Sequence, residues 1–129
     1  MVPVQVQGGE TISVDPTSLW WTRAALESEI AGTVLLRLGD QRLFSIEPLD
    51  AIKSRFAAAG VRLVQFTAPA GPISPTVNAD AVVRVEPPDP VHPSPEARAV
   101  LKFSFTVGLA VRETVPEAQA KIAKNPPVA

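Results

Sequence analysis

The chain has 129 residues, of which 46% are hydrophobic and 19% charged, a composition typical of one folded domain rather than of a disordered chain. Its 12 Lys and Arg nearly balance 13 Asp and Glu, so the strong positive field that binds nucleic acid is missing and no nucleic-acid partner is expected. With no Cys, no Tyr and one His, the chain lacks thiolate nucleophiles, thiolate zinc ligands and disulfides, and we expect neither an enzyme nor a cofactor.

The start of the chain has no basic region followed by an apolar stretch, and no apolar run approaches the roughly 18 residues of a membrane-spanning helix. The sequence therefore predicts no signal peptide and no membrane insertion. The expected location is the cytoplasm or the interior of a macromolecular assembly, and no small-molecule substrate is predicted.

The first half of the chain reads as five short strands followed by a helix. The strands are expected at residues 4–7, 13–15, 19–22, 35–38 and 44–46. Leu49, Ile52 and Phe56 fall at i, i+3 and i+7, the spacing of an amphipathic helix, and Gly60 suits the left-handed position after it. Residues 24–31, between the third and fourth strands, have helical composition.

The second half repeats this order of elements. Its strands are expected at residues 64–67, 76–78, 82–85, 100–103 and 109–111. Val115, Ala118 and Ile122 repeat the helical spacing, and Thr114 with Glu117 has the spacing of a capping box. The alternation of Ala99, Leu101, Phe103 and Phe105 places these side chains on one face of a half-buried strand.

The sequence thus predicts an α+β fold that is mainly β. Two tandem β-rich units, residues 1–60 and 61–124, each combine about five short antiparallel strands with a C-terminal helix and pack as a pseudo-twofold pair, because a unit of about 62 residues is marginal alone. Residues 125–129 are expected to form a flexible tail. Chance alignment of two β-rich halves is the alternative interpretation.

The halves differ most in residues 87–95, where prolines predict an extended arm. Proline cannot donate the hydrogen bonds of a sheet and biases its neighbours to extended conformations. The arm is either a stiff surface loop or a docking segment. Its predicted contact residues are Pro87, Pro88, Pro90, His92, Pro93 and Pro95.

Trp20 and Trp21 are neighbours in an expected strand, so their side chains point to opposite faces. The match between the halves places Trp21 outward, although a bulge reverses this assignment. An outward tryptophan is a common interface residue, and Trp21 is therefore a candidate contact for a partner. The alternative is that both tryptophans are buried because the sheet is covered on two sides.

The side chains of Asp15, Asn78 and Asp80 precede or enter expected strands, where Asn and Asp cap turns by hydrogen bonding to nearby backbone amides. This turn-cap interpretation is preferred to a ligand site. His92, with Glu86 and Asp89 nearby, offers a weak metal-binding pattern on a loop, and a solvated histidine is the preferred interpretation.

Residues 64–71 (VQFTAPAG), residues 77–89 (VNADAVVRVEPPD) and residues 111–114 (VRET) before a helix resemble the small FlbD-type flagellar and swarming-motility proteins. The resemblance covers residues 63–123 and, more faintly, residues 4–57. It implies a short β-rich protein that ends in a helix, and a motility-associated role without catalytic residues.

The residues and the resemblance together predict a non-enzymatic structural or protein-interaction module that assembles with itself or with a larger protein assembly. A structural component of a phage or similar particle is one alternative. A metal-dependent enzyme that uses His92 is another.

Overall fold

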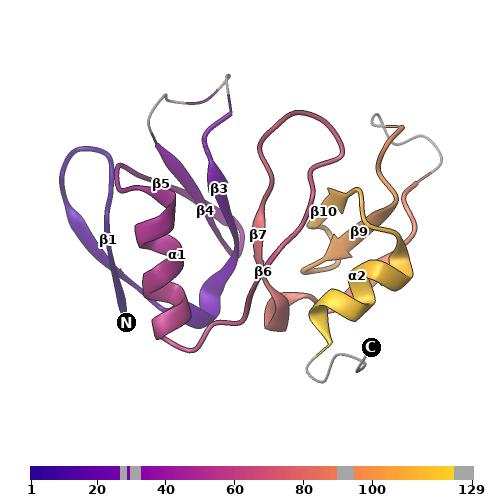
Figure 1. Cartoon of the computed structure of the whole chain (residues 1–129). Coiled ribbons are helices and arrows are strands. Elements are labelled where there is room, and N and C mark those ends of the chain that lie inside the picture. Colours follow the sequence, from indigo (N-terminus) through magenta and orange to yellow (C-terminus); the bar gives the residue numbers. More distant parts are fainter. Residues whose placement is uncertain (27–28, 30–32, 90–94, 124–129) are drawn as a thin grey trace.

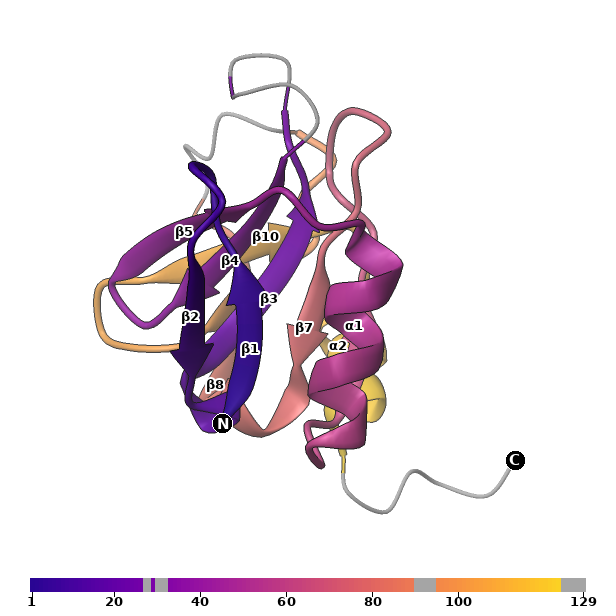
Figure 2. The same cartoon turned by 90° about the vertical axis from the view of Figure 1, so that its left-hand side faces the viewer.

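The computed structural model describes residues 1–26, 29, 33–89 and 95–123, and these residues form a mainly β fold. Among them, ten strands lie in three antiparallel sheets, accompanied by two α-helices (Figure 1). The predicted α+β class with a β majority is therefore confirmed. Both helices lie on the same side of the molecule, one beside each half of the chain (Figures 1 and 2).

The first half contains the predicted five strands and one helix. Its elements are β1 (Val2–Gln5), β2 (Thr11–Val14), the 3-10 turn η1 (Pro16–Ser18), β3 (Leu19–Ala24), β4 (Val34–Leu38), β5 (Gln41–Ser45) and α1 (Leu49–Ala58). Strands β1 and β2 form a hairpin, and β3 to β5 form a sheet in the order β5-β4-β3. Ala24 is still part of β3, so the helix expected over residues 24–31 does not begin there; residues 27–28 and 30–32 lie outside the described ranges.

The second half has the same kinds of element. They are β6 (Leu63–Gln65), β7 (Thr76–Asn78), the 3-10 turn η2 (Ala79–Ala81), β8 (Arg84–Glu86), β9 (Ala99–Lys102), β10 (Gly108–Val111) and α2 (Val115–Ile122). The predicted capping box at α2 is confirmed: the Thr114 side chain accepts from the Glu117 N–H, and the Glu117 carboxylate accepts from the Thr114 N–H.

Backbone contacts place all ten strands in one series. Val6, just after β1, bridges Ser45 at the end of β5, and the Arg112 N–H after β10 donates to the carbonyl of Thr67 after β6 at 2.9 Å. Strand β3 pairs with β7 and so links the two halves. Through these contacts of flanking residues, the three sheets follow one another in the order β2-β1, β5-β4-β3-β7-β6 and β10-β9-β8. Read in this way, the second five strands have the same order as the first five.

Each half also has the same capped turn between its hairpin and its sheet. The Asp15 carboxylate accepts from the Thr17 N–H at 3.0 Å, and the Asn78 side-chain oxygen accepts from the Asp80 N–H at 3.1 Å. The turn-cap interpretation of Asp15 and Asn78 is therefore confirmed.

The pairing of β3 with β7 joins the two halves, and in the part of the chain that the structure describes it is not matched by a pairing of the equivalent strands. A twofold axis that relates the halves requires a second pair, β8 with β2, because these strands are the counterparts of β3 and β7. In the described residues, β8 pairs with β9 alone and β2 with β1 alone. The halves are therefore joined head to tail, and the expected pseudo-twofold packing stays unconfirmed.

Two hydrophobic clusters form the core: the first is built from the first half, and the second from the second half together with Trp21. The first comprises Val2, Val4, Val14, Leu19, Val34, Leu36, Ile52 and Phe56, and the second comprises Trp21, Phe66, Val77, Ala99, Leu101, Phe103, Val111 and Ala118. Helix α1 buries Ile52 and Phe56 completely, whereas α2 buries Ala118 and packs a half-buried Ile122 against the second cluster. The core faces predicted for both helices are confirmed.

Candidate functional site

Trp21 is buried, with 7% of its surface exposed, so its predicted outward position is wrong. The strict alternation of strand side chains fails here because the register between β3 and β4 shifts between Leu19 and Trp21. A bulge of this kind leaves an extra residue, Trp20, outside the regular ladder and re-aims the neighbouring side chains.

Both indoles contact the second half of the chain. The Trp20 ring stacks on the Phe103 ring, with 5.5 Å between centroids and 19° between planes, and the Trp21 ring meets the same phenyl ring at 5.1 Å and 48°. The Arg37 guanidinium carbon lies 6.0 Å and 5.6 Å from the two indole centroids. The tryptophans therefore belong to the interface between the two halves of this chain, together with the β3–β7 pair.

The indole N–H of Trp21 is buried and has no hydrogen-bond partner among the described residues. An unpaired buried donor costs about 1–3 kcal/mol, while an aromatic pair contributes about 0.5–1.5 kcal/mol beyond its buried area. Trp21 is thus held at this interface by the shape and apolar surface of its ring rather than by its polar group.

Three of the six predicted contact residues of the proline-rich arm lie within the described part of the chain. Pro87 and Pro95 are exposed and Pro88 is half-buried, whereas Pro90, His92 and Pro93 lie outside the described residues. Strand β8, which leads into the arm, ends opposite the start of β9, whereas Trp21 contacts Phe103 just after the end of β9. The described start of the arm, which follows β8, is therefore not next to Trp21, and the contact role of the arm stays a prediction.

Two exposed apolar side chains lie where β8 begins and β9 ends. Val83 is 68% exposed and Phe105 is 87% exposed. The expectation that Phe105 shares the buried face of Leu101 and Phe103 is wrong, because β9 ends at Lys102 and the chain turns.

The turn that carries Phe105 is closed by hydrogen bonds. The Phe103 N–H donates to the Val107 carbonyl at 3.0 Å, and the Val107 N–H donates to the Ser104 hydroxyl at 3.1 Å. Phe105 therefore sits at the tip of a fixed turn. Val83 and Phe105 are named here the tip patch. The sequence did not predict their exposure; the available signal was the Ser-Phe-Thr run before Gly108, whose composition favours a turn.

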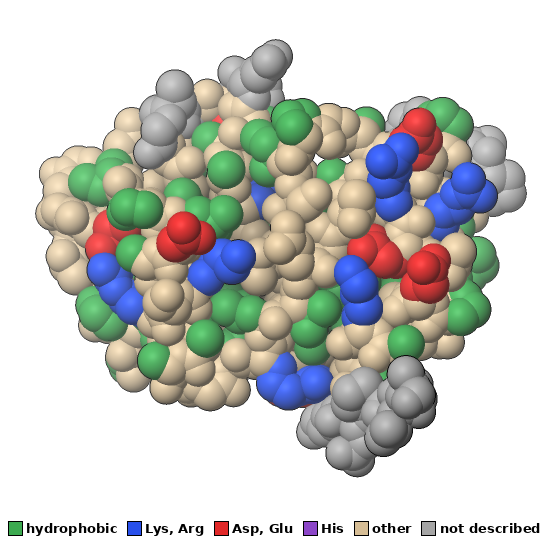
Figure 3. Space-filling model, viewed as in Figure 1, with side chains coloured by type: hydrophobic (Ala, Val, Ile, Leu, Met, Phe, Trp, Pro, Cys, Tyr) green, Lys and Arg blue, Asp and Glu red, His purple; other side chains and the backbone are tan. Residues whose placement is uncertain are grey.

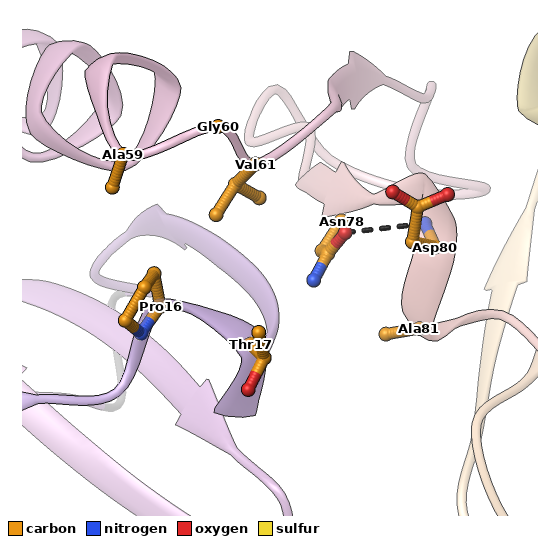
Figure 4. A pocket seen from close by; sticks show the side chains of 8 residues that line it. All are labelled: Pro16, Thr17, Ala59, Gly60, Val61, Asn78, Asp80 and Ala81. Carbon is orange, nitrogen blue, oxygen red and sulfur yellow. Dashed lines mark hydrogen bonds between the residues drawn. The ribbon is translucent and has the colours of Figure 1, made fainter.

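A hollow of about 170 Å³ lies between the two capped turns, beside the end of α1 (Figure 4). It is lined by Pro16, Thr17, Ala59, Gly60, Val61, Asn78, Asp80 and Ala81. Asn78 donates to the Leu19 carbonyl at 2.9 Å, and the Asp80 carboxylate accepts two bonds from Arg62. These polar groups are engaged in holding the turns, and the volume is below the roughly 300–1,000 Å³ of typical ligand sites.

The helix of each half is fastened to the first strand of that half by an ion pair, named here the helix clamp. In the first half, Glu47 accepts from the backbone N–H of Gln5 at 2.9 Å and pairs with Arg55. Arg55 also donates to the carbonyl of Pro3 at 3.0 Å. A hollow of about 280 Å³ lies over this clamp.

The clamp of the second half has the same plan. Glu113 accepts from the backbone N–H of Thr67 at 3.0 Å and from Lys121 Nζ at 2.8 Å, and Lys121 also donates to the carbonyl of Gln65 at 2.8 Å. Lys121 Nζ lies 5.0 Å from the centroid of the Phe66 ring. The ion pair spans eight residues in both halves.

The clamp carboxylates are held in the ionised form. Burial raises the pKa of Glu113, but the hydrogen bonds from Lys121 and from the Thr67 backbone outweigh it, so the pKa lies below its ordinary value. The pKa of Glu47 is lowered by the hydrogen bonds from Arg55 and from the Gln5 backbone. A carboxylate with a lowered pKa is a poor general acid or base near neutral pH, so the clamps act as structural fastenings.

Acidic and basic side chains lie interspersed on the face that carries the helices (Figure 3). Within the described residues, no three His, Cys, Asp or Glu side chains are grouped as metal ligands; His92 lies outside those residues. No helix in that part of the chain has both the length and the apolar character needed to cross a membrane.

No family model matches the chain, and comparison with the curated proteins and with the solved structures gave no match either. The resemblance to the FlbD-type proteins therefore stays a prediction.

Proposed function

We propose that the chain is a non-enzymatic protein-interaction module whose contact surface includes the tip patch of Val83 and Phe105. The observation that carries the proposal is the 87% exposure of Phe105 at the tip of a turn closed by hydrogen bonds. Full burial of a phenylalanine side chain contributes about 1.5–3 kcal/mol, and a turn whose backbone is already closed by hydrogen bonds loses little backbone entropy on binding.

The neighbouring Val83 supports this proposal. The side chain is 68% exposed at the start of β8, whose first paired residue lies opposite Lys102 at the end of β9. Val83 and Phe105 are large apolar side chains at the same end of a small sheet, so one partner can contact both.

The FlbD-type resemblance gives this role a more specific form. It suggests that the partner belongs to a motility-associated assembly, since residues 77–89 and 111–114 carry the matching motifs. This form of the proposal predicts a protein partner rather than a nucleic acid or a membrane.

The test is a photo-crosslinking residue placed at position 105, with the same residue at position 54 as the control. Ser54 is exposed on α1 and lies outside the tip patch. A protein that crosslinks from position 105 in native cells is identified by mass spectrometry, purified, and titrated against the wild-type chain and the Phe105→Ser variant.

The expected result is an increase in Kd of about tenfold or more for Phe105→Ser, with an unchanged thermal midpoint. The proposal fails when position 105 gives no adduct beyond that of position 54, or when the purified protein binds wild type and Phe105→Ser equally.

A further inference from the structure

Within the described residues, the series of ten strands ends in two edges, β2 and β8, that have no further strand partner. One end is β2, which lies at the end of the molecule that faces the viewer in Figure 2, and the other end is β8, at the opposite end of the series. Strand β7, the counterpart of β2, and strand β3, the counterpart of β8, pair with each other inside the chain. The chain thus contains one completed junction and the two separated halves of a second.

The capped turns and the sheet pairings fix which residues correspond. Asp15 and Asn78 cap equivalent turns, so Ser13 and Val14 of β2 correspond to Thr76 and Val77 of β7. Trp21 pairs with Arg37 of β4 and Arg84 with Lys102 of β9, so Arg84 and Val85 of β8 correspond to Trp21 and Thr22 of β3.

Two residues at the β3–β7 junction are buried, whereas their counterparts on the edges of β2 and β8 are exposed, as expected for contact residues that have no partner strand. Thr76 is 3% exposed inside the junction, whereas its counterpart Ser13 is exposed on β2. Trp21 is 7% exposed, whereas its counterpart Arg84 is exposed on β8.

The tip-patch residue Val83 corresponds to Trp20. Inside the chain, Trp20 reaches across the junction and stacks on Phe103 of the next half. The counterpart of Phe103 is Leu38, a half-buried residue packed on the first cluster. A second copy joined in the same way therefore covers Val83, which is 68% exposed in the single chain.

We propose that copies of this chain join head to tail, with the free edge of β8 in one copy paired antiparallel to the free edge of β2 in the next. The register transferred from the internal junction sets Arg84 opposite Val14 and Val85 opposite Ser13. This inference rests on the proposed interaction role and names the partner as a second copy.

The junction between copies is weaker than the junction within the chain. Asn78 donates a hydrogen bond to the Leu19 carbonyl across the internal junction, whereas its counterpart Asp15 has no side-chain donor to offer. At the position equivalent to Trp21, the junction between copies has the charged guanidinium of Arg84 instead of an apolar indole. Association is therefore reversible and depends on concentration, although β2 carries no proline or charged residue that would block pairing.

The first test is the mass of the purified chain by sedimentation and light scattering at concentrations up to about 1 mM. The expected result is a mass that rises with concentration. Ser13→Lys sets a charged side chain opposite the half-buried Val85 on the proposed edge and is expected to weaken association about tenfold or more. Ser54→Lys, the same substitution on the exposed face of α1, is the control and leaves association unchanged.

The second test uses the absence of native cysteine. The Ser13→Cys, Val85→Cys double variant is expected to form disulfide-linked dimers and longer chains under mild oxidation, because residues directly opposite in a sheet lie within disulfide reach. Thr11→Cys with Val85→Cys is the control, displaced by two residues along the same face. Either a series of disulfide-linked multimers of increasing length or a closed dimer supports the proposal.

A chain that stays monomeric throughout, or one whose association is unaffected by Ser13→Lys, overturns the inference. So do crosslinks formed equally by the two cysteine pairs. These outcomes are separable from the broader interaction role, since a monomeric chain that still binds a different purified protein through Phe105 refutes self-pairing and leaves that role standing.

Discussion

Replacing the buried carboxylate of the second helix clamp, Glu113→Gln, tests whether the clamps hold the helices to the strands. Glu113 is 9% exposed and accepts hydrogen bonds from the Thr67 N–H, the Thr67 hydroxyl and Lys121. Hydrogen bonds to charged groups contribute about 1.5–3 kcal/mol each. Lys121 is 39% exposed, which screens its part, and glutamine still accepts one bond.

The expected loss of unfolding free energy is therefore about 2 kcal/mol. For a chain of this size, 1 kcal/mol corresponds to about 4 °C in Tm, so the midpoint falls by about 8 °C. The assay is urea unfolding followed by tryptophan fluorescence, with thermal unfolding as a second measurement. Glu47→Gln removes the same carboxylate from the first clamp and is expected to behave alike.

The pH dependence gives an independent check. Folding lowers the pKa of Glu113, so its contribution is fully present above the unfolded value of about 4.3 and is lost as the pH falls through the lower folded value. The difference between wild type and Glu113→Gln therefore shrinks below about pH 4.

The matched control is Glu96→Gln, which removes the same charge from an ion pair with Arg112 whose side chains are 50% and 53% exposed. An exposed pair contributes little, and this variant is expected to lie within about 0.5 kcal/mol of wild type. Equal midpoints for Glu113→Gln and Glu96→Gln, or a Glu113→Gln deficit that persists at low pH, refute the reasoning.

Phe56→Ala removes a fully buried ring and is expected to cost about 3–5 kcal/mol, whereas Ile122→Ala, at a half-buried position, costs about 2 kcal/mol; equal urea midpoints for the two variants contradict this order. Trp21→Ala is expected to lower the free energy of unfolding by about 3–5 kcal/mol. Trp21→Phe is expected to lower it by much less, because this variant also removes the unpaired indole N–H. A larger loss for Trp21→Phe than for Trp21→Ala in thermal unfolding argues against this account. Thr114→Ala removes one half of the capping box and is expected to cost about 1 kcal/mol, while an unchanged circular-dichroism melt shows that the cap is dispensable.

Features that depend on a few neighbouring residues were predictable from the sequence. The helix starts and core faces follow from the cap at Thr114 and from the spacing of Ile52 and Phe56, because these interactions form within one or two helical turns. The position after α1 was predictable for the same reason, since Gly60 takes a φ of 94° that few other residues adopt.

Features set by distant contacts were not predictable. The bulge at Trp20 arises where β3 meets β4 on one side and β7 on the other, and no local pattern marks it. Phe105 continued an apolar alternation by sequence, but the turn that closes on Val107 overrides that pattern. Contact sites on the surface therefore needed the structure, whereas the order of elements did not.

Both tryptophans belong to the first half but pack in the second cluster, so the two halves differ in whether they can form a core from their own residues. The buried residues of the first cluster all lie between Val2 and Phe56, and the partly buried side chains packed on it extend only to Leu63, so this core can form while the rest of the second half is still being synthesised. The second half cannot complete its own core without Trp20 and Trp21, which are synthesised long before Phe103. The N-terminal half thus serves as an intramolecular template, and a fragment that begins at residue 61 is expected to collapse without a defined native state.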